Sequence, residues 1–184
     1  MKESNFLEIF KTAAKQVLEN NCVVTTKANL LYELFVNRKL EFCPATPTKP
    51  SRGNSAFQTD LCVFEKINEI EFPRVVIEFK TKVTTHDIIT YSWKAGKHKS
   101  IYPSLRYGIL ASEINRIPNR FFIHNENIDF FIAASKYKEG MLLTFAKELI
   151  LKELLVSQKL DKINFENYEF DYYRSELVLE NFMK

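Results

Sequence analysis

The chain has 184 residues, of which 46% are hydrophobic and 14% aromatic, with only 4 glycines and 6 prolines. This length suits one domain, and the apolar content is enough for a core, which excludes a disordered or low-complexity protein. No apolar run approaches the roughly 18 residues of a membrane span, and the first residues lack the apolar segment of a signal peptide. We therefore expect a single domain over residues 1–184 and no membrane association.

The cysteine content indicates the compartment of the protein, and the distribution of charge indicates the kind of partner it binds. The three cysteines, Cys22, Cys43 and Cys62, are widely spaced and odd in number, which disfavours disulfides and structural zinc and favours a reducing compartment, the cytoplasm. The net charge is only +3, but residues 74–120 hold nine Lys and Arg against three acidic residues. This surplus favours an anionic partner, with nucleic acid first, over the alternative of an ordinary solvated helix face.

The first third of the chain is predicted to be helical. Apolar side chains recur at helical spacing over residues 5–20 and again over residues 27–39, so we expect an amphipathic helix in each range. Residues 43–54 follow, with three prolines and one glycine, and this composition predicts a long loop.

The rest of the chain alternates between predicted strands and helices. The sequence favours strands where β-branched and aromatic residues gather and helices where the apolar spacing lengthens to three and four. In chain order we expect strands at 56–65 and 74–81, a helix at 86–100, strands at 106–111 and 128–134, and a helix at 139–158. This order predicts a mixed α/β or α+β domain.

Three charged residues interrupt the two central strands. Glu78 and Lys80 share one face of the strand at 74–81, and Asp60 breaks an apolar segment of the preceding strand. Burying such charges costs free energy, so their presence in these strands indicates a binding or catalytic role. If the two strands pair as a hairpin, Asp60 and Glu78 converge on one cation, and two carboxylates with open positions suit Mg²⁺. Such an ion activates water and polarises phosphate, while Lys80 offsets developing charge. The alternative is an exposed edge strand with a Lys–Asp ion pair.

These residues carry a resemblance to a known family. The runs Gln58-Thr59-Asp60-Leu61 and Val76-Ile77-Glu78-Phe79-Lys80, a basic helix and the strand at 106–111 together resemble the PD-(D/E)xK nuclease superfamily over about residues 27–112. That superfamily includes type II restriction endonucleases, Holliday-junction resolvases and repair exonucleases. Its core runs helix, three strands, helix, strand. The resemblance implies a restriction-endonuclease-like fold with a central mixed β-sheet flanked by helices.

The resemblance also implies roles for individual residues. Asp60 and Glu78 would bind Mg²⁺, with Mn²⁺ able to take its place, the Phe79 carbonyl would complete the metal shell, and Lys80 would be the catalytic lysine. Many members add a glutamate from the helix before the strands, and Glu33 is the candidate here, against the alternative of an ordinary solvated glutamate. Thr59 stands where the family pattern has proline.

A second group of residues is expected to contact DNA. On the predicted helix 86–100, Tyr91, Lys94 and His98 share a face and Lys97 lies alongside, which suits phosphate and base contacts. The alternative is a plain exposed face. The Gln-x-x-x-Tyr pattern of the exonuclease branch is absent between residues 80 and 106. Arg52 and Asn54 form a further candidate contact at the tip of the long loop.

We therefore expect an Mg²⁺-dependent DNA endonuclease, most similar in pattern to type II restriction endonucleases or their catalytic domains. The expected substrate is double-stranded DNA, and the expected assembly is a homodimer, because cutting both strands usually needs two active sites. A structure-specific resolvase or repair nuclease is the alternative within the class. A catalytically silent DNA-binding module with the same fold is the alternative outside it. The core would span about 27–112, followed by a C-terminal strand and helix within 128–158.

Overall fold

The computed structural model describes residues 3–51, 55–166, 171–174 and 176–179. The elements of its first half are α1 (Glu3–Val17), β1 (Cys22–Leu31), β2 (Phe35–Val36), β3 (Phe42–Cys43), β4 (Ala56–Ile67) and β5 (Ile70–Lys80). Those of its second half are α2 (Thr85–Ile101), β6 (Arg106–Ala111), α3 (Asn119–His124), β7 (Phe130–Ala133) and α4 (Glu139–Phe165). No helix within the described residues is long and apolar enough to cross a membrane.

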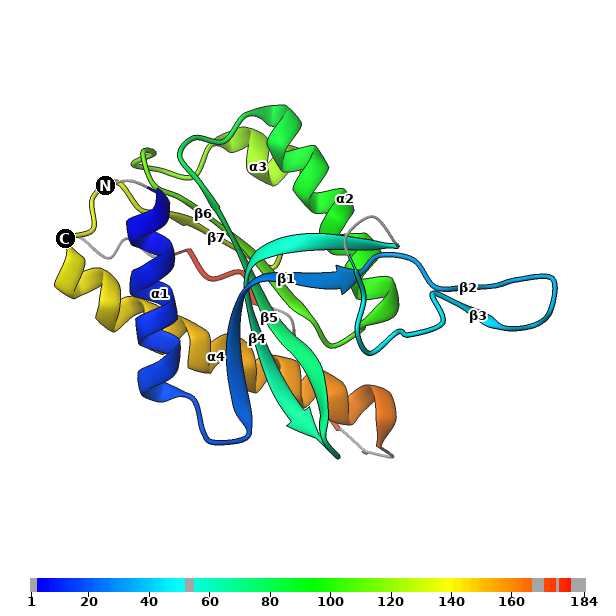
Figure 1. The fold of residues 1–184 in the computed structure, drawn as a ribbon. Helices are drawn as coiled ribbons and strands as arrows, with labels where there is room; N and C mark the ends of the chain where they lie inside the picture. Colours follow the sequence, from blue (N-terminus) through cyan, green and yellow to red (C-terminus); the bar gives the residue numbers. More distant parts are fainter. Residues whose placement is uncertain (1–2, 52–54, 167–170, 175, 180–184) are drawn as a thin grey trace.

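The main sheet has five strands in the order β1-β4-β5-β6-β7. The pairs β1/β4 and β4/β5 are antiparallel, whereas β5/β6 and β6/β7 are parallel. Helix α2 makes the crossover that a parallel β5/β6 pair requires. The strands β2 and β3 form a separate hairpin, which projects away from the sheet in Figure 1. The mixed α/β architecture with a central mixed sheet flanked by helices is thus confirmed.

Helices cover both faces of this sheet, with α1 and α4 on one side and α2 and α3 on the other (Figure 1). Each layer has its own buried apolar cluster. Residues Val75, Ile77 and Phe79 of β5 pack in the cluster with α1 and α4, while Val76 packs in the cluster with α2. Because strand side chains alternate between faces, Glu78 and Lys80 emerge beneath α2.

The helix predicted at residues 27–39 is wrong. The first part of this range, up to Leu31, belongs to β1. This strand pairs antiparallel with β4, so that Leu30 lies opposite Phe57. The β-branched run at 23–26 is the local signal that favours a strand here. Glu33 therefore lies on no helix: it is exposed in the turn after β1, so its predicted role as a helical glutamate is also wrong. The hairpin β2/β3 and the short α3 are additional elements that the sequence did not predict.

Candidate metal and nucleic-acid site

The ladder between β4 and β5 ends just before the two acids. The two strands pair antiparallel from Ile67–Ile70 to Leu61–Ile77, which meets the condition for Asp60 and Glu78 to converge. One residue beyond the last pair, Asp60 Oδ2 accepts a hydrogen bond of 2.8 Å from the backbone N–H of Phe79. The Asp60 side chain thereby replaces the next ladder bond and holds its carboxyl beside Glu78.

Glu78 is buried next to this carboxyl. Its side chain is 3% exposed, and the Tyr107 hydroxyl donates a hydrogen bond of 2.6 Å to its Oε1. Burial raises the pKa of Glu78 to about 7, and both the charge of Asp60 and a hydrogen bond with the Asp60 carboxyl add to this rise. The hydrogen bond from Tyr107 acts in the opposite direction. Two carboxyls in such contact need either a proton or a cation between them.

This arrangement suits Mg²⁺. In an antiparallel ladder the N–H and C=O of one residue point to the same neighbouring strand, so the Phe79 carbonyl faces the side from which Asp60 approaches. Mg²⁺ binds through one or two carboxylates and keeps several waters, which fits Asp60, Glu78 and this carbonyl. The described residues contain no group of three or more His, Cys, Asp or Glu side chains that could hold a metal. A metal here would therefore use the two acids, the carbonyl and water.

Lys80 lies beside the acids and contacts α2. Its ammonium nitrogen is 4.9 Å from the centroid of the Tyr91 ring. Burial by itself lowers the pKa of Lys80, but a hydrogen bond with Tyr91 and the charges of Tyr91, Asp60 and Glu78 outweigh it and raise the pKa. Lys80 is therefore held in its charged form. The Lys94 ammonium lies 5.0 Å from the centroid of the same Tyr91 ring. The structure therefore brings together Lys80, Tyr91 and Lys94, which are all predicted site residues.

The predicted DNA-contacting face of α2 is only partly accessible. His98 is fully buried: its Nδ1 lies 2.7 Å from the carbonyl oxygen of Leu31, and its ring stacks on Tyr107 with centroids 6.0 Å apart. Burial lowers the pKa of His98 to about 4, so the ring is neutral. The prediction that His98 contacts DNA is wrong, because α2 turns this side chain toward the sheet. Lys97 is exposed and Lys94 half-buried.

The outward side of α2 carries a large aromatic side chain, Trp93, which is 51% exposed. The inward side is formed by Ile88, Tyr91, Ser92, Ala95 and His98. The spacing of three and four residues along that set was the signal available in the sequence.

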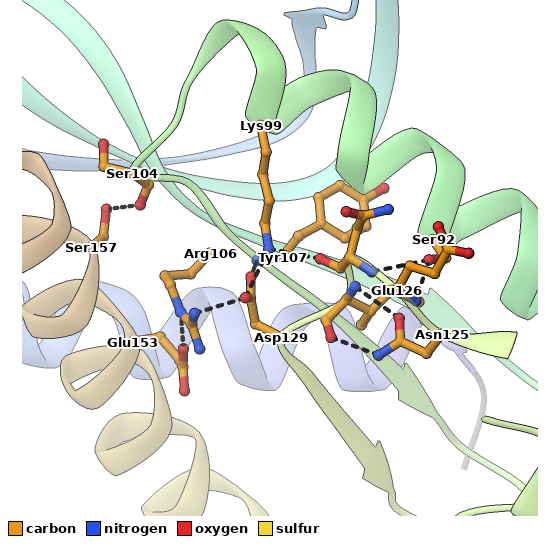
Figure 2. A network of polar contacts seen from close by, with 12 residues as sticks. Ser92, Lys99, Ser104, Arg106, Tyr107, Asn125, Glu126, Asp129, Glu153 and Ser157 are labelled. Atoms are coloured by element: carbon orange, nitrogen blue, oxygen red, sulfur yellow. Dashed lines mark hydrogen bonds and ion pairs between the residues drawn. The ribbon is translucent and has the colours of Figure 1, made fainter. Parts of the chain in front are cut away.

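Part of the basic surplus is internal. Arg74, Lys99 and Arg106 are three of the nine basic residues between positions 74 and 120, and all three form ion pairs with acids inside the fold. The partners are Glu65 and Asp161 for Arg74, Asp129 for Lys99, and Asp129 and Glu153 for Arg106, at distances from 2.7 to 2.9 Å. Figure 2 shows Lys99 and Arg106 meeting at Asp129. These cations stabilise the fold and are not available to a partner.

Arg52 and Asn54 lie outside the described residues. Protein-family models give no match to the chain, and curated protein sequences give none either. The function is therefore inferred from the geometry of the site itself.

Proposed function

We propose that the chain is an Mg²⁺-dependent DNA endonuclease that hydrolyses phosphodiester bonds at Asp60, Glu78 and Lys80. The observation that carries the proposal is the convergence of Asp60 and the buried Glu78 where the β4/β5 ladder ends, with Lys80 alongside. A buried carboxyl next to a second, half-buried one costs stability when both are charged, and binding a divalent cation offsets that cost. A catalytically silent DNA-binding module would have no need of this pair.

The order of the elements also supports the proposal. In the main sheet and its first two helices, the chain runs α1, β1, β4, β5, α2, β6. This is the order of helix, three strands, helix and strand expected from the PD-(D/E)xK resemblance, with β1 in the position that sequence analysis had given to a helix. Asp60 stands on the second of these strands, β4, and Glu78 and Lys80 stand on the third, β5.

Each residue has a distinct task in the proposed reaction. Asp60, Glu78 and the Phe79 carbonyl would hold Mg²⁺, which when bound supplies a more acidic water and a polarised phosphate. The Tyr107 hydroxyl fixes the orientation of Glu78, and Phe79 N–H fixes that of Asp60. The Lys80 ammonium, held by Tyr91, offsets negative charge on the phosphate as the bond to the leaving oxygen breaks.

The proposal includes the partner, the assembly and the compartment. The substrate is double-stranded DNA, and a homodimer supplies two active sites for its two strands. All three cysteines are free, in keeping with the reducing conditions of the cytoplasm.

Cleavage assays test the proposal directly. Plasmid and phage DNA would be incubated with the protein and Mg²⁺, and the products separated by size. Discrete fragments would identify a sequence-specific enzyme and a smear a nonspecific nuclease, whereas intact DNA would refute the proposal. Parallel reactions with a four-way junction test the alternative of a resolvase.

Isosteric variants locate the reaction. Asp60→Asn and Glu78→Gln should abolish cleavage, because each removes a charge that the metal requires. Glu113→Gln is the matched control, since Glu113 is an exposed acid whose carboxylate pairs with Lys82 at 3.8 Å. Cleavage by either site variant at the wild-type rate would show that the reaction occurs elsewhere.

A further inference from the structure

An open groove of about 430 Å³ lies between α2 and the segment that includes α3 and leads to β7. Its lining includes Ile89, Trp93, Lys97, Ile123, Glu126 and Asn127. Trp93 and Ile123 are 51% and 73% exposed, so two large apolar side chains of the groove face solvent beside its polar groups. A concave site with an aromatic wall and a few convergent polar groups is typical of a ligand site.

The polar wall of this groove is held rigidly against α2. The Ser92 hydroxyl oxygen accepts hydrogen bonds from the backbone N–H of Glu126 and Asn127, at 2.8 and 3.1 Å. The Lys99 ammonium donates to the Asn127 carbonyl at 2.7 Å. Figure 2 shows Ser92 reaching from α2 to this segment. Because the wall is already ordered, a ligand loses little free energy in organising it.

A row of alternating lysines and aromatic rings joins the groove to the two acids. The Lys80 ammonium lies 4.9 Å from the centroid of the Tyr91 ring, and the Lys94 ammonium lies 5.0 Å from the same centroid. The Lys94 ammonium is also 5.3 Å from the centroid of the Phe57 ring, which is 5.9 Å from that of Trp93. Lys97 lies 5.7 Å from the Trp93 ring on the same helix. Lysines that attract phosphates beside rings that stack on bases are the combination used to bind single-stranded nucleic acid. A base within a duplex offers no free face for such stacking.

We propose that this groove binds the base of an unpaired nucleotide in a DNA strand whose phosphates lie along Lys94 and Lys97. Trp93 stacks on the base. The carboxylate of Glu126 and the amide of Asn127 face its edge, and these groups suit the exocyclic amino groups of cytosine and adenine, which thymine lacks. The inference deepens the proposed function by naming an unpaired segment as part of the substrate, and it rests on that function for the choice of DNA.

Trp93 provides a direct readout because it is the single tryptophan of the chain. Oligonucleotides of roughly 12 residues, within the site sizes known for single-strand binding, would be titrated in EDTA so that no cleavage occurs. We expect single-stranded oligo-dA and oligo-dC to quench Trp93 fluorescence and to bind more tightly than oligo-dT, whereas a duplex of equal length, which binds through its phosphates, should leave the fluorescence of Trp93 nearly unchanged. Equal quenching by the duplex would overturn the proposal.

Two variants separate stacking from edge recognition. By anisotropy of a labelled oligonucleotide, Trp93→Leu should weaken single-strand binding by about 5- to 150-fold, as expected for the loss of one stacked base. Phe165→Leu, which changes an exposed aromatic side chain on α4 across the sheet, is the control and should bind as wild type. Asn127→Ala should reduce the preference for dA and dC over dT. Unchanged binding by Trp93→Leu, or unchanged base preference in Asn127→Ala, would overturn the proposal.

The outcome is separable from that of the proposed function. Tight single-strand binding that depends on Trp93, in a protein that never cleaves DNA, would support the groove and refute the nuclease. Cleavage that depends on Asp60 and Glu78, together with binding that ignores Trp93, would refute the groove alone.

Discussion

The buried Glu78 predicts an unusual dependence of stability on pH. Its pKa rises from 4.5 to about 7 on folding. Between these pH values the unfolded chain has released the proton of Glu78 while the folded chain keeps it, so the free energy of unfolding falls as the pH rises. At about 1.4 kcal/mol per pH unit, the loss attributable to Glu78 reaches about 3 kcal/mol at pH 7.5 and above.

His98 has the opposite effect over nearly the same range. Burial lowers its pKa from 6.5 to about 4, so the folded chain resists a proton that the unfolded chain accepts, and stability rises with pH. The two contributions largely cancel in the wild type. The effect of Glu78 must therefore be measured as a difference between the wild type and Glu78→Gln, which stays neutral at every pH and can still accept from Tyr107.

The assay is urea unfolding from pH 4 to pH 8.5 in EDTA, with folding followed by far-UV circular dichroism. We expect the variant to gain about 3 kcal/mol relative to the wild type between the acid and alkaline ends. Adding Mg²⁺ at pH 8 should then stabilise the wild type, by about 2.7 kcal/mol at a hundred times the dissociation constant, and the variant much less. A difference that stays flat with pH would refute the burial argument. Equal stabilisation of both proteins by Mg²⁺ would refute the metal site.

Three further predictions concern other parts of the molecule. His98→Asn, which can still donate to the Leu31 carbonyl, should gain stability relative to the wild type as the pH falls from about 6.5 to 4, because the variant has no ring whose protonation favours unfolding; a difference between the two proteins that stays flat with pH in the same unfolding assay would contradict this. Replacing both Lys94 and Lys97 with alanine should flatten the slope of log affinity for duplex DNA against log salt by up to about two, and an unchanged slope would place the DNA elsewhere. Arg74→Ala should cost about 3–5 kcal/mol in unfolding experiments, because it leaves two carboxylates without their cation; a loss below about 1 kcal/mol would contradict this account.

The strands that carry the acids were predictable because their pattern is local. Period two in residues 74–81 is a property of extended backbone, and it separates Glu78 and Lys80 from Val75, Ile77 and Phe79 without knowledge of any partner. The contact between the acids also follows from the antiparallel hairpin that the short connection between the two strands requires. Here the sequence contained both the residues and their geometry.

The error at residues 27–39 has a physical cause. Helical spacing is present in Leu30, Leu31, Leu34 and Phe35. Leu30 and Leu31, however, lie on β1 and pair with the first residues of β4, a strand that begins at Ala56, 26 residues after Leu30. Phe35 begins a hairpin that projects from the sheet. A window of neighbouring residues cannot contain such long-range pairing, so periodicity alone selected the wrong element.

From residue 56 on, the sequence by itself determined the order of the main strands and the longer helices and the positions of Asp60, Glu78 and Lys80, because these depend on backbone periods and short connections. Only the tertiary structure decided which side of α2 faces solvent. His98 is buried in contact with the Leu31 carbonyl and the Tyr107 ring, whereas Trp93 is exposed to solvent. Tertiary structure also decided which cations are free, since Arg74 meets Asp161 across 87 residues of sequence. Burial and ion pairing depend on what each side chain meets in space, and a sequence lists only neighbours along the chain.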